Sequence, residues 1–110
     1  MTQTQNAARK RVAFVCTNFT MQSAFGLFIL ALNSARLGYE TMIYFTFEGL
    51  NMIRPGFLEN IRYYPTGVEP PEEMSVHFTE NLRNTMDRKD IPYCEDMMAM
   101  AQLEAVAFLA

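Results

Sequence analysis

The stretch VAFVCTNFTMQSAFGLFILALNSARLGYETMIYFTF, from Val12 to Phe47, decides the fold. It opens with a continuous apolar run, Val12–Cys16, of the kind found in strands buried on both faces of a parallel sheet. After a polar turn, apolar residues at helical spacing predict a helix to about Leu37: Ala24, Leu27, Phe28, Ala31 and Ala35. Gly38 ends this helix, and the β-forming run Glu40–Phe47 predicts a second strand. Strand, helix and strand in this order predict a βαβ unit with a right-handed crossover.

The rest of the chain supplies further elements of the same α/β kind. We expect a short helix over Glu48–Ile53, a helix over Met74–Arg88 and another from about Tyr93, together with two more strands, Asn60–Tyr64 and Ala105–Leu109. The sequence therefore predicts one α/β domain over residues 11–110, preceded by a disordered tail over residues 1–10. Its parallel sheet should hold about four strands flanked by helices, with Val12–Cys16 between Glu40–Phe47 and Ala105–Leu109.

Composition excludes several classes of function. A length of 110 residues leaves room for one domain, and a net charge of −3 argues against a nucleic-acid binder. The apolar run Ala24–Leu32 is much shorter than the ~20 residues that span a bilayer, so no membrane partner is expected. Two cysteines, Cys16 and Cys94, do not form the disulfide framework of a small secreted protein. We therefore expect a cytoplasmic protein.

Several common sites lack the residues that they need. The loop Thr17–Ser23 contains no glycine, so the backbone cannot approach a phosphate as it does in dinucleotide and P-loop sites. His77 is the only histidine, and the two cysteines lack the paired spacing of a zinc site. We expect no cofactor and no bound metal, and we interpret His77 as a surface histidine.

The two thiols are the candidate catalytic residues. Cys16 lies at the carboxyl end of the first strand, where open α/β sheets place their ligand crevice, although a free cysteine is also a common small core residue. Cys94 lies in the first turn of a helix, where N–H groups favour a thiolate and the neighbouring Glu95 and Asp96 oppose it. We expect Cys94 to be the more accessible and more reactive thiol. Glu48 is either an acid–base group or a helix first-turn glutamate.

An oligomer is expected from the last predicted strand. The sequence ends at Ala110, directly after Ala105–Leu109, so one face of the sheet would be thinly covered unless the chain continues or a neighbouring subunit covers it. Methionines clustered on the preceding helix would add apolar surface for such a partner. We therefore expect a homo-oligomer.

Two segments resemble a known family. The helix end Ile29–Glu40 and the strand and turn Tyr44–Arg54 are similar to the hallmark segments of DsrE/DsrF-like sulfur-carrier (sulfurtransferase) proteins. The resemblance implies a Rossmann-like three-layer α/β fold, assembly into oligomers and transfer of sulfane sulfur as a cysteine persulfide. It also implies that no cofactor is required, because one sulfur attacks another directly.

The resemblance implies a subunit of a cytoplasmic sulfur-relay system, with Cys94 or Cys16 as the persulfide site and other sulfur-carrier proteins as donor or acceptor. Two other functions stay open. The chain could be a non-catalytic structural partner in a DsrE-like oligomer, or it could bind a small ligand in the crevice above Cys16 and Glu48.

Overall fold

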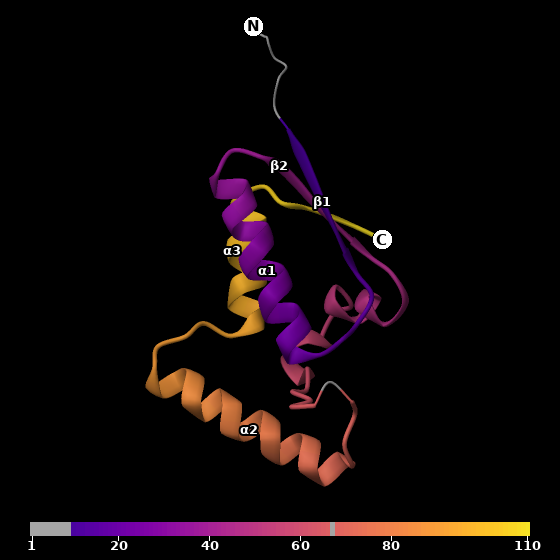
Figure 1. Ribbon diagram of the computed structural model, residues 1–110, viewed down its shortest axis with the longest axis vertical. Helices are drawn as coiled ribbons and strands as arrows, with labels where there is room; N and C mark the ends of the chain where they lie inside the picture. Colours follow the sequence, from indigo (N-terminus) through magenta and orange to yellow (C-terminus); the bar gives the residue numbers. More distant parts are fainter. Residues whose placement is uncertain (1–9, 67) are drawn as a thin grey trace, which may run out of the picture.

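The computed structural model describes residues 10–66 and 68–110 of the chain. Along these residues the chain forms three strands, three α-helices and two short 3-10 helices (Figure 1). In chain order these are β1 (Arg11–Cys16), α1 (Met21–Arg36), β2 (Glu40–Phe45), η1 (Phe47–Met52), η2 (Leu58–Asn60), α2 (Glu72–Arg88), α3 (Cys94–Leu103) and β3 (Ala107–Leu109). The predicted α/β fold with a parallel sheet is confirmed, with three strands in place of about four. Apart from Lys10, the predicted tail lies outside the described residues.

The βαβ unit forms as its sequence predicts. The side chain of Thr20 accepts a hydrogen bond from the Ser23 N–H at 3.3 Å and so caps the start of α1. After Leu37, Gly38 takes φ +96, a left-handed conformation that strains other residues and lets the chain turn into β2. β1 then pairs with β2 in parallel, with register from Arg11 opposite Glu40 to Cys16 opposite Phe45.

The predicted strand order is wrong, because β2 and not β1 occupies the centre of the sheet. The reason lies in the helices. The end of α3 lies beside the end of α1, where Arg36 and Glu104 form an ion pair at 3.3 Å. Since α1 leads directly into β2, a chain leaving α3 at this point meets the free edge of β2, where β3 pairs in parallel. Apolar patterning identified the strands but carried no information about which of them are neighbours.

The core lies between the sheet and the pair α1 and α3, which run side by side against one of its faces (Figure 1). Ile43 and Phe45 of β2 and Phe28 of α1 have no exposed surface. The ring of Phe108 from β3 meets Phe45 edge-on at 5.5 Å and Phe28 at 6.2 Å. The central strand and its helix therefore place large side chains in the fully buried part of the core, where their removal from water stabilises the fold.

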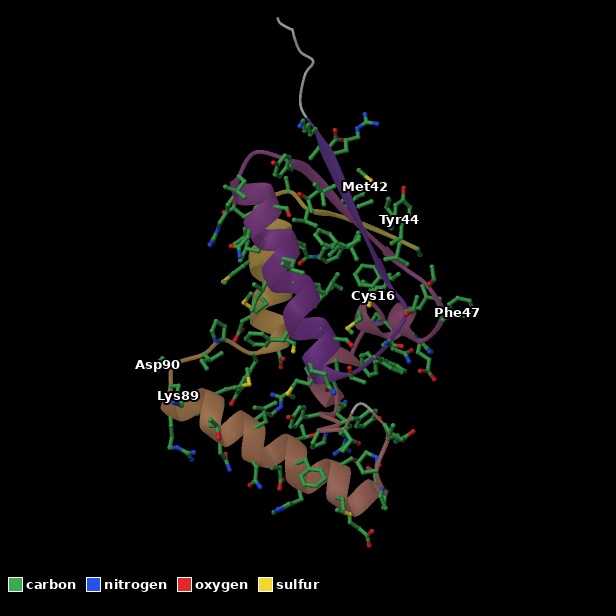
Figure 2. The ribbon with its side chains drawn as sticks, in the orientation of Figure 1. Cys16, Met42, Tyr44, Phe47, Lys89 and Asp90 are labelled. Carbon is green, nitrogen blue, oxygen red and sulfur yellow. The ribbon has the colours of Figure 1, made fainter. Side chains whose placement is uncertain are left out.

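The opposite face of the sheet is largely apolar and lies open in the described chain. Residues alternate along a strand, so this face carries the ion pair of Arg11 and Glu40 at one end of the sheet. Its other residues are apolar: Ala13, Val15, Met42, Tyr44, Ala107 and Leu109. Val15 is 65% exposed, and Figure 2 shows Tyr44 pointing away from α1 and α3. We call these six residues the open face. Parallel sheets are normally covered on both sides, so a bare apolar face is unusual.

Residues 60–64 do not form the predicted third strand. The chain there makes one turn of η2 and then runs extended, but its backbone groups bond to helices instead of to a neighbouring strand. The Arg62 carbonyl accepts from the Met21 N–H at 2.7 Å, and the Tyr63 N–H donates to the Thr79 hydroxyl at 2.9 Å. These hydrogen bonds, one to α1 and one to α2, hold α2 near the start of α1. None of the helices formed by residues 10–66 and 68–110 is long and apolar enough to cross a membrane.

Candidate functional site

Cys16 is the last residue of β1, at the carboxyl edge of the sheet (Figure 2). Its thiol donates a hydrogen bond to the Asn18 carbonyl at 3.4 Å, and its own carbonyl accepts from the Thr46 N–H at 2.9 Å. The second bond extends the pairing of the two strands by one residue and turns the chain sharply into η1. Gly49 of η1 consequently lies directly over the Cys16 backbone.

A small hollow of about 110 Å³ opens beside this thiol. We call it the thiol hollow; it is lined by Val15, Cys16, Thr17, Asn18, Ser23 and Leu27. One water needs roughly 10–15 Å³ of such space, so the hollow has room for an additional sulfur atom on Cys16. Burial raises the pKa of the Cys16 thiol above its ordinary value, and backbone hydrogen bonding with Asn18 partly lowers it.

A larger hollow of about 540 Å³ lies at the same edge of the sheet and shares Asn18 and Ser23 with the thiol hollow. We call it the edge hollow. The first turn of α1 and the segment before α2 form its walls, because the Gln22 side chain bonds to both the N–H and the carbonyl of Tyr64. Glu48 and Asn51 from η1 and Glu69 from the loop before α2 complete the polar lining.

The prediction that Cys94 is the more accessible thiol is wrong. Its side chain begins α3 in the core and is 1% exposed, against 5% for Cys16. Its thiol donates to the Met21 carbonyl at 3.7 Å. Burial first and the charge of Glu95 second raise the pKa of Cys94 to about 11, although Arg83 opposes the shift. The favourable effect of the helix start is outweighed here, because Cys94 is buried beneath the start of α1 and burial disfavours the charged thiolate.

The structure brings together some of the predicted site residues and separates others. Cys16 and Glu48 both lie at the carboxyl edge of the sheet, as the crevice argument predicted, and Glu48 lies in the first turn of η1. Cys94 lines neither hollow. His77 is exposed on α2, where its ring bonds to Asn81 at 3.3 Å. No group of three or more metal-ligating side chains occurs among the residues that the structure describes.

Sequence reasoning missed part of the edge hollow. Asn18 lies two residues after β1, and Asn51 lies in η1, the first element after β2, so the ends of the two strands could have indicated both. Tyr64 and Glu69 carried no such signal. They reach the hollow because the extended segment after η2 docks on α1, a contact that no local pattern predicts.

The raised pKa of Cys94 predicts a loss of stability at alkaline pH. The unfolded thiol, with its ordinary value of 9.0, loses its proton before the folded thiol, which has a pKa of about 11. The stabilising effect is therefore fully present below about pH 8 and falls as pH rises toward 11. By about pH 10.5 we expect the free energy of unfolding of the protein to have fallen by about 2 kcal/mol from this cause.

Urea unfolding at neutral pH and at about pH 10.5 measures this loss. Cys94→Ala leaves a small cavity whose destabilising effect does not depend on pH, so the comparison is between the two slopes with pH. The wild type should lose about 2 kcal/mol more than the variant over this range. Equal losses would show that Cys94 does not titrate abnormally.

Comparison with known proteins identifies the family. The family model described as DsrE/DsrF/DrsH-like matches residues 8–110 of this chain. A protein of Allochromatium vinosum named sulfur carrier protein DsrE2 is 39% identical over 46 residues. That match covers 42% of this chain and 29% of the relative, so it spans less than a third of the relative's length. Because the family model covers nearly the whole chain, including every element of the described fold, the protein belongs to the DsrE/DsrF/DrsH-like family.

Proposed function

We propose that this chain is a subunit of a sulfur-relay system and that Cys16 accepts and passes sulfane sulfur as a persulfide. Family membership and the name of the sulfur carrier relative support the general role. We assign the persulfide to Cys16 because the thiol hollow opens beside Cys16 and not beside Cys94. Cys16 is also the more exposed of the two thiols.

The chemistry requires only thiols. The Cys16 thiolate attacks the outer sulfur of a donor persulfide, and the new S–S bond forms as the old one breaks. The donor leaves as a thiolate, which then takes up the proton that Cys16 had released and becomes a thiol. An acceptor thiolate then takes the outer sulfur from Cys16 in the same way, so the transfer has no net oxidation or reduction. A raised pKa reduces the thiolate fraction at neutral pH, but each thiolate is then a stronger nucleophile.

Loading with a sulfane donor followed by intact-protein mass spectrometry tests the proposal. A polysulfide and a neutral organic trisulfide are used in parallel, so that the charge of the donor does not decide the outcome. With the polysulfide we expect the wild type and Cys94→Ser to gain mass in steps of one sulfur atom. With the trisulfide RSSSR we expect both to gain an RS or RSS group as RSS⁻ or RS⁻ leaves, and Cys16→Ser should gain mass from neither donor. Cys94→Ser is the matched control because both thiols are buried.

The same measurement decides between this function and the structural alternative. Burial of both thiols favours a DsrE-like subunit that completes an oligomer without carrying sulfur. If the wild type gains no sulfur from either donor, that alternative replaces the relay. If only Cys94→Ser abolishes the gain, the relay stands and the assignment to Cys16 is wrong.

We also propose a cytoplasmic oligomer whose donor and acceptor are other sulfur-carrier proteins. Both cysteines are free thiols, which suits a reducing compartment. The open face supports assembly, because its apolar side chains would be covered by another protein surface. Light scattering at micromolar concentration should give a mass above the 12.7 kDa of one chain; a monomer would contradict the proposal.

A further inference from the structure

The charged side chains that line the edge hollow are all negative, and the proposed sulfur transfer does not use them. Two carboxylates, Glu48 and Glu69, line it, and no lysine, arginine or histidine does. Among residues 10–66 and 68–110, neither carboxylate has a hydrogen-bond or ion-pair partner. The nearby Arg62 is engaged elsewhere, because its guanidinium pairs with Glu72 at 3.1 Å. Arg54 lies outside the lining, where its guanidinium donates to the Asn51 amide oxygen at 3.2 Å and stacks on the Phe57 ring. The lining itself therefore presents two carboxylates and no cation.

The start of α1 borders the hollow and would ordinarily favour an anion there. Three of its first four N–H groups are already used, however. The Met21 N–H donates to the Arg62 carbonyl at 2.7 Å, the Ser23 N–H to the Thr20 hydroxyl, and the Ala24 N–H to the Thr20 carbonyl at 2.9 Å. The helix terminus contributes about half a positive charge, which is smaller than the charge of the two carboxylates. The balance of charge in the hollow is negative.

The raised pKa of the Tyr64 hydroxyl agrees with a negative charge in the hollow. Burial is the first cause that raises the pKa of its hydroxyl, and the negative charges of Glu69, Glu48 and Glu72 follow, with Arg62 opposing them. The Gln22 side chain donates to the Tyr64 carbonyl and accepts from the Tyr64 N–H, so these two hydrogen bonds fix the backbone of Tyr64 in the wall. The ring of Phe19 lines another part of the hollow.

We propose that the edge hollow is a binding site for a small organic ammonium ion, such as an aliphatic amine or diamine. Its N–H groups would donate to the carboxylates of Glu48 and Glu69 and to the amide oxygen of Asn18, since the Asn51 amide oxygen already accepts from Arg54. Its hydrocarbon part would lie against Phe19 and Tyr64, since aromatic surfaces attract cations as well as alkyl groups. The site adjoins the thiol hollow, with which it shares Asn18 and Ser23, but binding of an amine there requires no sulfur on Cys16.

Isothermal titration calorimetry at low ionic strength tests the site with putrescine as the probe. Succinate, which carries two negative charges on a similarly short chain, is the comparison. Putrescine should bind and succinate should not. Glu48→Gln and Glu69→Gln should each weaken putrescine by about two- to fivefold, the usual range for a partly exposed ion pair. Glu73→Gln is the control, because Glu73 is also exposed but lies on α2 outside the lining of the hollow.

Amide chemical shifts locate the bound probe. Both glutamine variants replace exposed side chains, so their spectra and thermal unfolding should match those of the wild type. Putrescine should shift Asn18, Thr20, Asn51 and Tyr64 in the wild type and shift them less in the two variants. The proposal is overturned if Glu73→Gln weakens binding as much as the other two, if succinate binds as tightly, or if the shifts spread over the whole acidic surface.

Discussion

Phe45→Ala is expected to lower the free energy of unfolding by about 3–5 kcal/mol, the range for removing a fully buried phenylalanine. Phe45 lies in the central strand β2, has no exposed surface and meets the ring of Phe108 edge-on. The substitution removes its transfer energy and leaves a cavity between the sheet and α1. A domain of this size is stabilised by about 5–15 kcal/mol in total, so the variant should unfold at a much lower denaturant concentration.

Phe47→Ala is the matched control for this prediction. Phe47 is two residues further along, carries the same side chain and is 82% exposed (Figure 2). Its removal should change stability by no more than about 0.5 kcal/mol. Urea unfolding of both variants gives the comparison. Similar losses for the two would mean that the central strand does not hold the core in the way described.

Gly49→Ala should cost about 3 kcal/mol, at the upper end of the range for overpacking. A Cβ on Gly49 would lie 2.2 Å from the Cys16 carbonyl oxygen and 2.6 Å from its carbon. Both are backbone atoms of β1, so the clash can be relieved only by moving the strand or η1. The shift would also disturb the thiol hollow, since the same Cβ would lie 3.0 Å from the Cys16 sulfur.

Gly26→Ala is the same substitution at another position, and its expected effect on stability is the opposite. Gly26 lies in the middle of α1, and a Cβ there would meet nothing within 4 Å. Alanine favours the helix over glycine, so this variant should gain about 0.5–1 kcal/mol. Thermal or urea unfolding of the two variants measures the contrast. A Gly49→Ala protein as stable as the wild type would show that η1 does not press on Cys16.

Local patterns predicted the βαβ unit because each of its signals lies within a few residues of the element that it defines. The apolar run before Cys16, the helical spacing after Thr20 and the turn at Gly38 all act through neighbouring residues. The place of Cys16 at the carboxyl edge followed from the same unit. The strand assigned to residues 60–64 failed because tertiary contacts with Met21 and Thr79 used its backbone groups, and composition does not record such contacts.

The accessibility of the two thiols could not be predicted for a related reason. A helix start is exposed or buried according to which element lies over it, and Cys94 is covered by the start of α1, 73 residues earlier in the chain. The partner of β3 was likewise set by the contact between α1 and α3. Site residues contributed by consecutive elements were predictable, and those brought in by distant ones were not.

The central position of β2 has a consequence for the order of folding. Partners in β1 and β2 lie 29 residues apart, as in Arg11 and Glu40, whereas Met42 of β2 meets Ala107 of β3 across 65 residues. Closing the longer loop loses more chain entropy, and β3 offers only three paired residues in return. The first strand pair can therefore assemble early with α1, while β3 docks late and detaches first in local opening. In the folded protein, one edge of the central strand should thus exchange its amide hydrogens faster than the other.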